Sequence, residues 1–306
     1  MKRSLFLFLA VSILASCQDE TVILVPIDPL TVESEVFVSD SGEEFFMGAL
    51  TSFCYGFAGS ANIHENSLVD YPIPDNLPSE VDLSNFLPPV GNQGRLPSCT
   101  AWATTYYGRS LQVNIQNAAR TNKKVAFSPS FIYNQMTEGN NCIPTSVQFA
   151  MEKLVSEGAL GLDLFPYQAE GCDELPKEEN QILAQEYRLN GFKVLTGENM
   201  ISEMKALLND QNPVVITMGL DLEFGKKDDA GLSAYRPHRV VPKDIQGAHA
   251  MLVVGYSDEN NAFKVVNSWG EGWGDAGFFW ADYDAFEDVL NPDKEFRVLC
   301  EAVVGF

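Results

Sequence analysis

One cysteine lies where a thiol could act as a nucleophile. Cys99 follows a glycine-containing turn, residues 91–98, and opens a proline-free stretch, residues 99–126, in which Trp102 and Tyr106 lie at helical spacing. A thiol in the first turn of a helix faces unpaired N–H groups and the positive end of the helix dipole. Both favour the thiolate, which is the reactive form. The alternative interpretation is a small buried cysteine in a core helix.

Two later stretches supply partners for such a thiol. His249 begins an apolar, β-branched run that predicts a buried strand, and Asn267 ends the next predicted strand, residues 263–266. Taken alone, the histidine could be a core residue and the asparagine a turn former. Together with Cys99 they provide a nucleophile, a base and a group that orients the base. Gln93, six positions before Cys99, can bring an amide near the sulfur.

These motifs resemble the papain-like cysteine peptidases over residues 77 to the C-terminus. The resemblance is carried by Gln93, Cys99, His249 and the run Asn267-Ser268-Trp269-Gly270. His249 lies 150 positions after Cys99 (249 − 99) and Asn267 lies 168 after it (267 − 99), whereas the family expectation for both is roughly 130–150. We therefore expect an insertion before His249. The loop-like residues 221–246 are the candidate, and they should lie near the mouth of the site.

The resemblance implies a fold of the α+β class. We expect a papain-like two-lobe fold in residues 77–306, with a helical lobe built on a central helix from Cys99 and a second lobe resembling an antiparallel β-barrel. It also implies a set of roles. Cys99 would attack as the thiolate, and His249 would act as acid and base. Asn267 would orient His249, and Trp269 would cover the His249–Asn267 hydrogen bond. Gln93 and the Cys99 N–H would form the oxyanion hole.

This chain departs from the family pattern next to the nucleophile. Leu96 and Pro97 stand where the family commonly has cysteine and glycine, and Thr100 stands where an aromatic residue usually follows the nucleophile. The proposed catalytic set is nevertheless complete. The departures therefore concern the shape of the substrate subsites more than the chemistry.

Local signals predict the remaining elements. Ser128 and Pro129 predict a helix start, and the capping-box pattern from Thr145 to Gln148 predicts another helix that runs to Val155. Further helices are expected at residues 177–188 and 200–208, and strands at residues 192–195, 213–218, 278–280 and 297–304.

The N-terminus carries an export signal. Residues 1–16 combine Lys2 and Arg3 with an apolar stretch too short to span a bilayer, which is typical of a signal peptide. The end of this stretch resembles a bacterial lipobox, so cleavage would leave Cys17 as a lipidated residue and attach the protein to a membrane. The alternative is an ordinary secretory signal with a chance cysteine. Residues 17–76 would form a tether or a short pro-like segment.

The acidic residues after Cys17 bear on location. Residues 18–20 resemble the surface-export signal of Bacteroides-type lipoproteins. We therefore expect an exported, lipid-anchored protein at the outer membrane or the cell surface, with the periplasm as the alternative.

Cysteine counting suggests disulfides. With Cys17 lipidated and Cys99 reactive, four of the six cysteines remain, and an even remainder in an exported protein suggests two bridges with three possible connectivities. Two free buried thiols are the alternative to a second bridge. The family resemblance implies Cys142–Cys172, which leaves Cys54 and Cys300. If these two pair, the N-terminal segment is stapled to the domain, would be structural, and need not be released for activation.

Composition limits the partners. A formal net charge of −22 disfavours nucleic acid as a ligand. With three histidines and no CxxC pair, a metal site is not expected, and neither is a cofactor. We expect a monomer that acts on peptides or proteins. The alternatives are a transglutaminase-like or amidase-like acyl transferase, which Gln93 and the Asn-Ser-Trp-Gly run disfavour, and a non-catalytic surface binding protein on a peptidase scaffold.

Overall fold

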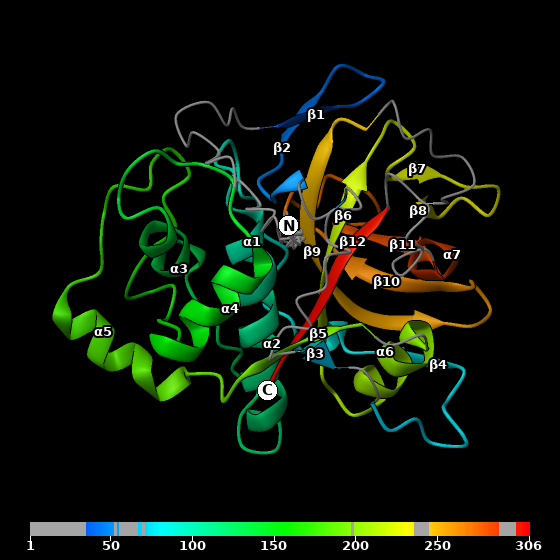
Figure 1. Cartoon of the computed structure of the whole chain (residues 1–306), viewed down its shortest axis with the longest axis horizontal. Coiled ribbons are helices and arrows are strands. Elements are labelled where there is room, and N and C mark those ends of the chain that lie inside the picture. Colours follow the sequence, from blue (N-terminus) through cyan, green and yellow to red (C-terminus); the bar gives the residue numbers. More distant parts are fainter. Residues whose placement is uncertain are drawn as a thin grey trace, which may run out of the picture. The chain divides into compact units, whose positions relative to one another are not determined.

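The computed structural model describes residues 35–51, 54, 67–68, 71–196, 199–235, 245–287 and 298–306. These residues belong to one compact unit, Val32–Phe306. Figure 1 shows several helices on one side of this unit and a large twisted sheet, with further helices beside it, on the other. The helix that starts at Cys99 lies between the two sides. This arrangement confirms the predicted papain-like α+β fold.

The central helix is continuous but irregular. It begins as α1, Cys99–Ala101, continues as a π-helical segment, Trp102–Arg109, and ends as α2, Ser110–Asn117. The hydroxyl of Thr104 donates to the carbonyl of Thr100 at 2.8 Å, so side-chain bonding competes with the regular main-chain pattern in the first turns. The predicted helix start at Cys99 is confirmed, and the π-helical turns were not predicted.

A serine cap begins each of the two helices beside the central helix. Ser128 Oγ accepts from Phe131 N at 3.2 Å before α3, Pro129–Met136. Ser146 Oγ accepts from Phe149 N at 3.1 Å before α4, Val147–Ser156. The predicted cap at Thr145 is wrong by one residue, because the Thr145 hydroxyl is used in a 2.5 Å hydrogen bond to the hydroxyl of Thr100. Three further helices are α5 (Glu178–Ala184), α6 (Met200–Asn209) and α7 (Asp284–Glu287).

The sheet is mainly antiparallel and is centred on a fully buried strand, β9 (Gly247–Ser257). The strand order is β3-β5-β12-β6-β9-β10-β11-β8-β7, and β4 also pairs with β9. The bounds are β3 Ser67–Leu68, β4 Glu80–Asp82, β5 Phe192–Leu195, β6 Val214–Leu220, β7 Lys226–Lys227, β8 Ser233–Tyr235, β10 Ala262–Val266, β11 Phe278–Asp282 and β12 Leu299–Gly305. Residues 221–246, expected to be loop, therefore contain β7 and β8, which extend the sheet edge.

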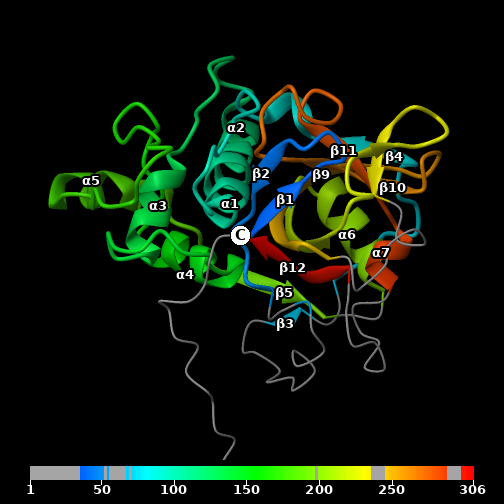
Figure 2. The same cartoon turned by 90° about the horizontal axis from the view of Figure 1, so that it is seen from above.

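A hairpin precedes the region that resembles the family. Strands β1 (Val36–Val38) and β2 (Glu44–Phe46) pair in antiparallel register. Residues 47–51 then continue toward the junction of the two lobes. Figure 2 shows β1 and β2 next to α1 and β9.

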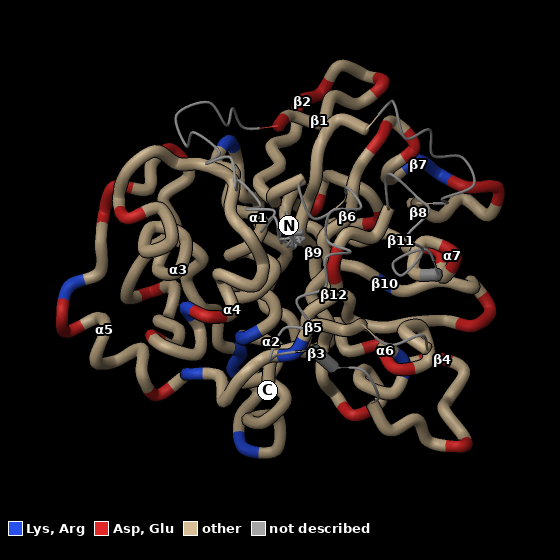
Figure 3. Tube along the Cα trace, viewed as in Figure 1, with Lys and Arg blue, Asp and Glu red and all other residues tan. Residues whose placement is uncertain are grey.

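Two disulfides join distant parts of the chain. Cys142 pairs with Cys172, and Cys54 pairs with Cys300 on β12. Among the described residues Cys99 is the free cysteine. Figure 3 shows acidic residues on outer loops of both lobes. Within the described ranges, no helix is long and apolar enough to cross a membrane.

The cap of α4 gives a stability prediction. Ser146→Ala removes the acceptor for the Phe149 N–H, so we expect a loss of about 1 kcal/mol in the free energy of unfolding. Ser146→Asp keeps an acceptor and serves as the matched control. Urea unfolding of the three proteins measures the difference, and equal midpoints for Ser146→Ala and wild type would contradict this assignment of the cap.

Candidate active site

The sulfur of Cys99 lies at the junction of the two lobes. Ala250 N, on β9, lies 3.4 Å from Cys99 Sγ and donates to it, and the N–H of Gly48 donates to it as well. Ala250 directly follows His249 in the sequence. The register of β9 therefore brings the histidine beside the helix that carries the thiol.

The imidazole of His249 is oriented by an amide oxygen. His249 Nε2 lies 2.8 Å from Asn267 Oδ1, which also accepts from Ser268 N at 2.7 Å. Because the amide oxygen can only accept, this bond requires the hydrogen on Nε2. The neutral ring then has its lone pair on Nδ1, which is buried and has no hydrogen-bond partner among the described residues. Nδ1 is thus the atom able to take a proton.

Gln93 is oriented by bonds on both sides of its amide. Ser268 Oγ donates to Gln93 Oε1 at 2.6 Å, which leaves Nε2 as a donor to the carbonyls of Leu96 at 2.9 Å and Phe46 at 3.0 Å. The main chain of Gln93 is fixed as well, because the Tyr167 hydroxyl donates to its carbonyl at 2.7 Å. The donor expected for an oxyanion hole is therefore already occupied by the carbonyl of Phe46.

Trp269 covers the histidine. Its ring lies 4.6 Å from the His249 ring, centroid to centroid. Phe37 and Phe45 of the hairpin stack on Trp269 at 5.5 and 4.7 Å. These rings exclude water from the His249–Asn267 hydrogen bond.

Burial favours the neutral forms of the two reactive groups. Desolvation raises the pKa of Cys99 to about 12, although four backbone N–H groups oppose the shift. Desolvation lowers the pKa of His249 to about 4, and the Asn267 hydrogen bond opposes that shift. The covered site therefore holds a thiol and a neutral imidazole.

The structure places Gln93, Cys99, His249, Asn267 and Trp269 near one another, and their catalytic roles remain predictions. Sequence reasoning missed the contacts of Phe46 and Gly48, which act through backbone atoms and leave no side-chain signal. It also missed the supporting bonds of Ser268 and Tyr167, although Ser268 belongs to a motif noted in the sequence. Cys17 lies outside the described residues. Within the described ranges, no group of acids, histidines and cysteines could hold a metal ion.

The fold and the site define a two-lobed cysteine hydrolase. The sequence profile of the papain family cysteine proteases matches residues 77–288, and the chain belongs to that family. It is accordingly a cysteine-type peptidase domain.

Named relatives agree with this assignment. The chain is 27% identical to Zingipain-2 of Zingiber officinale over 227 residues, which cover 72% of this chain and 92% of that protein. It is 25% identical to cathepsin K of Mus musculus over 211 residues, covering 67% of this chain and 59% of that protein. The chain spans less than two thirds of the length of several relatives, including two proteins of Arabidopsis thaliana named as probable cysteine proteases.

Solved structures share the fold. Xylellain, a cysteine protease from Xylella fastidiosa, matches with a TM-score of 0.64 and 22% identity, covering 84% of this chain and 97% of that one. Digestive procathepsin L 3 of Tenebrio molitor larval midgut matches with a TM-score of 0.60 and 19% identity, covering 83% and 77%.

The buried imidazole predicts an acid limit of stability. The folded pKa of His249, about 4, lies below its ordinary value of 6.5, so protonation favours the unfolded chain. Stability contributed by the neutral ring should be complete above pH 6.5 and should be lost as the pH falls to about 4, by roughly 3 kcal/mol. Urea midpoints of wild type and His249→Gln between pH 4 and 8 test this. The two curves should converge toward acid pH, and curves that stay parallel would contradict the prediction.

Proposed function

We propose that this protein hydrolyses peptide bonds through Cys99, His249, Asn267 and Gln93. The observation that carries the proposal is the contact of Cys99 Sγ with β9 at the residue after His249, with the ring oriented by Asn267. A nucleophile, a base and an orienting amide on separate elements fit acyl-transfer chemistry.

The reaction then has two halves. His249 Nδ1 takes the proton of Cys99, and the thiolate attacks the carbonyl carbon of the substrate. The developing oxyanion accepts a hydrogen bond from Gln93 Nε2, once that donor is released from Phe46. The imidazolium protonates the leaving amine, and the thioester is hydrolysed by a water molecule that His249 deprotonates.

The oriented Gln93 amide and the covering Trp269 favour hydrolysis over the two alternatives. A binding protein without activity has no need for an amide held by Ser268 at 2.6 Å. A transferase would have to admit a second amine in place of water. Product analysis distinguishes hydrolysis from transfer, because only transfer joins an added amine to the peptide.

Substitution of the nucleophile tests the mechanism. Cys99→Ala should reduce hydrolysis of a fluorogenic peptide library to the background rate and abolish labelling by an epoxide inhibitor, because the sulfur is lost. Its unfolding transition should remain cooperative. The contradicting result is hydrolysis by Cys99→Ala at the wild-type rate.

We also propose that the protein is exported and lipid-anchored through Cys17, at the outer membrane or cell surface. The support is the lipobox-like end of residues 1–16 and the acidic residues that follow it.

Metabolic labelling tests the anchor. When the full chain is expressed in a bacterium with tritiated palmitate, wild type should incorporate label and partition into the membrane fraction. Cys17→Ser should lose both properties, because the thiol that carries the lipid is absent. Equal labelling of the two proteins would show that Cys17 is not the acylated residue.

A further inference from the structure

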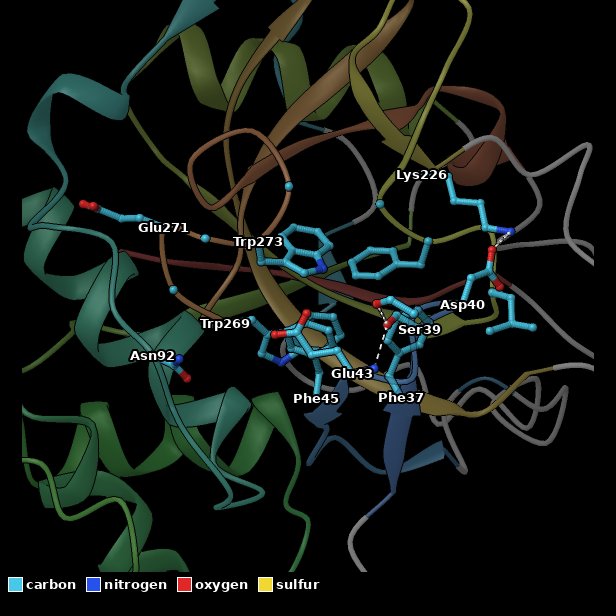
Figure 4. Close-up of a pocket in the computed structure, with 17 residues that line it drawn as sticks. Phe37, Ser39, Asp40, Glu43, Phe45, Asn92, Lys226, Trp269, Glu271 and Trp273 are labelled. Carbon is cyan, nitrogen blue, oxygen red and sulfur yellow. Dashed lines mark hydrogen bonds and ion pairs between the residues drawn. The ribbon is translucent and has the colours of Figure 1, made fainter.

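The turn that precedes the nucleophile is held by the sheet lobe along one side. Gln93 N donates to Ser268 O at 2.8 Å, and Ser268 Oγ donates to Gln93 Oε1 at 2.6 Å. Asn92 forms a β-bridge with Trp269, and Figure 4 shows these two residues on neighbouring segments beside a pocket. These bonds attach the turn to the lobe that carries the imidazole. The attachment to the lobe that carries the thiol is separate.

One hydroxyl from the helical lobe bonds to the other side of the turn. The Tyr167 hydroxyl donates to the carbonyl of Gln93 at 2.7 Å, and Ser98 Oγ lies 2.8 Å from the same phenolic oxygen. A phenol has one hydrogen, so the Ser98 hydroxyl is the donor in the second bond. Desolvation raises the pKa of Tyr167, so its hydroxyl stays protonated and donates at neutral pH. Tyr167 therefore joins two positions of the turn that are five residues apart (98 − 93).

The Tyr167 bridge spans the two groups expected to stabilise an oxyanion. Gln93 carries the donor Nε2, and Ser98 directly precedes Cys99, whose backbone N–H is the expected second donor. Within the turn, Gln93 Nε2 also donates to the Leu96 carbonyl at 2.9 Å, which orients the amide but shares the donor nitrogen. The bonds of Tyr167 to the Gln93 carbonyl and the Ser98 hydroxyl use neither donor. They can therefore persist while both donors bind a substrate oxygen.

The loop that carries Tyr167 is itself well supported. The Tyr167 ring packs edge-to-face on Trp102 of the central helix, with the ring centroids 4.9 Å apart. The N–H of the next residue donates to Ser130 Oγ on α3 at 3.1 Å. A disulfide holds the same loop at Cys172, five positions later (172 − 167). The hydroxyl is thus fixed relative to the helix that begins at the nucleophile.

We propose that Tyr167 is a positioning residue for the oxyanion donors, and that its hydroxyl determines where Gln93 lies relative to Cys99. The inference rests on the proposed peptidase function and adds one residue to it. Tyr167 acts through Gln93 and Ser98, and not by contact with the reacting carbonyl.

The geometry of an oxyanion site explains why this position matters. Donors are effective at about 2.7–3.1 Å from the developing charge, and removal of one donor costs about 10²–10³-fold in kcat. Loss of the Tyr167 hydroxyl would release the turn on one side and displace Gln93 Nε2 without removing it. The expected loss is therefore smaller, about tenfold.

Two variants remove the bridge to different extents. Tyr167→Phe removes the bridging oxygen and keeps the ring that packs on Trp102, so Gln93 O and Ser98 Oγ lose their shared partner. Ser98→Ala removes one of the two bonds and leaves the bond to the Gln93 carbonyl in place. Its effect should therefore be smaller, about threefold. Ser98→Ala carries the test if Tyr167→Phe does not fold, which circular dichroism shows.

Tyr256→Phe is the matched control. The Tyr256 hydroxyl also donates to a backbone carbonyl at 2.7 Å, that of Pro78. Tyr256 lies on β9 seven positions beyond His249 (256 − 249), which at about 3.3 Å per residue is roughly 23 Å along the strand. The same chemical change far from the turn should leave the rates at wild-type values.

The test compares two reactions of the same thiol, in the full chain at neutral pH without reductant. Hydrolysis of a fluorogenic peptide places negative charge on a carbonyl oxygen, whereas alkylation by iodoacetamide displaces iodide from a CH₂ carbon and forms no oxyanion. Both reactions need the same access to Cys99, so the ratio of kcat/KM to the alkylation rate constant reports on the oxyanion donors. In Tyr167→Phe this ratio should fall about tenfold, through kcat and with KM unchanged.

Binding of a peptide aldehyde is an independent readout. The Cys99 sulfur bonds to the aldehyde carbon and the thiol proton moves to the aldehyde oxygen, which gives a hemithioacetal with its oxygen at the place of the oxyanion. This adduct resembles the transition state, so its affinity for Tyr167→Phe should fall by about the same factor as kcat/KM.

The outcomes separate the positioning role from the function. A lower ratio and weaker aldehyde binding in Tyr167→Phe, with Tyr256→Phe at wild-type values, support the role. An unchanged ratio in folded Tyr167→Phe overturns the role and leaves the peptidase function intact. Equal falls in hydrolysis and alkylation also overturn it, because such a loss belongs to the thiol. A wild type that binds the aldehyde but hydrolyses no peptide contradicts the function, and the aldehyde affinity of Tyr167→Phe then decides the role.

Discussion

The structure depends on the contact between the start of the central helix and strand β9. Cys99 belongs to the helix, His249 and Ala250 belong to the strand, and the only way to bring thiol and imidazole together is to pack one lobe on the other. The Ala250 N–H donates to the sulfur at 3.4 Å across this contact. Since β9 is buried along its whole length, a shift of one residue in its register would move His249 to the opposite face of the sheet. The apolar core therefore fixes the geometry of the polar site.

Local motifs predicted those parts of the site that act through side chains. Gln93, Cys99, His249 and Asn267 could be found because each lies in a short run with a distinctive composition. Contacts made by backbone atoms could not be found in this way. Every residue has a backbone carbonyl, and every residue except proline has a backbone N–H. The residue types at positions 46 and 48 therefore do not reveal these contacts, even though the space at Gly48 admits only glycine.

The same distinction applies to the fold. Helix starts at Cys99 and Ser128 were predicted, because a dipole argument and a side-chain cap act within a few residues. The capping-box spacing predicts the cap of α4 at Thr145. This prediction is wrong because the buried Thr145 hydroxyl forms a hydrogen bond with the hydroxyl of Thr100 instead. Strands β7 and β8 were missed because they are two and three residues long and are stabilised by pairing at the sheet edge, which is a tertiary effect.

The closed site also follows from the need to satisfy buried donors. Gln93 Nε2 and Trp269 Nε1 both donate a hydrogen bond to the same acceptor, the carbonyl oxygen of Phe46. A buried N–H without a partner costs roughly 1–3 kcal/mol, so a dry, empty junction would be unfavourable. The junction must therefore hold water, the segment that carries Phe46 or a peptide. A peptide presenting a carbonyl oxygen at this place competes with the Phe46 carbonyl for the same two donors. Gln93 Nε2, the donor proposed to stabilise a reacting carbonyl, is thus one of the two donors that bind the Phe46 carbonyl.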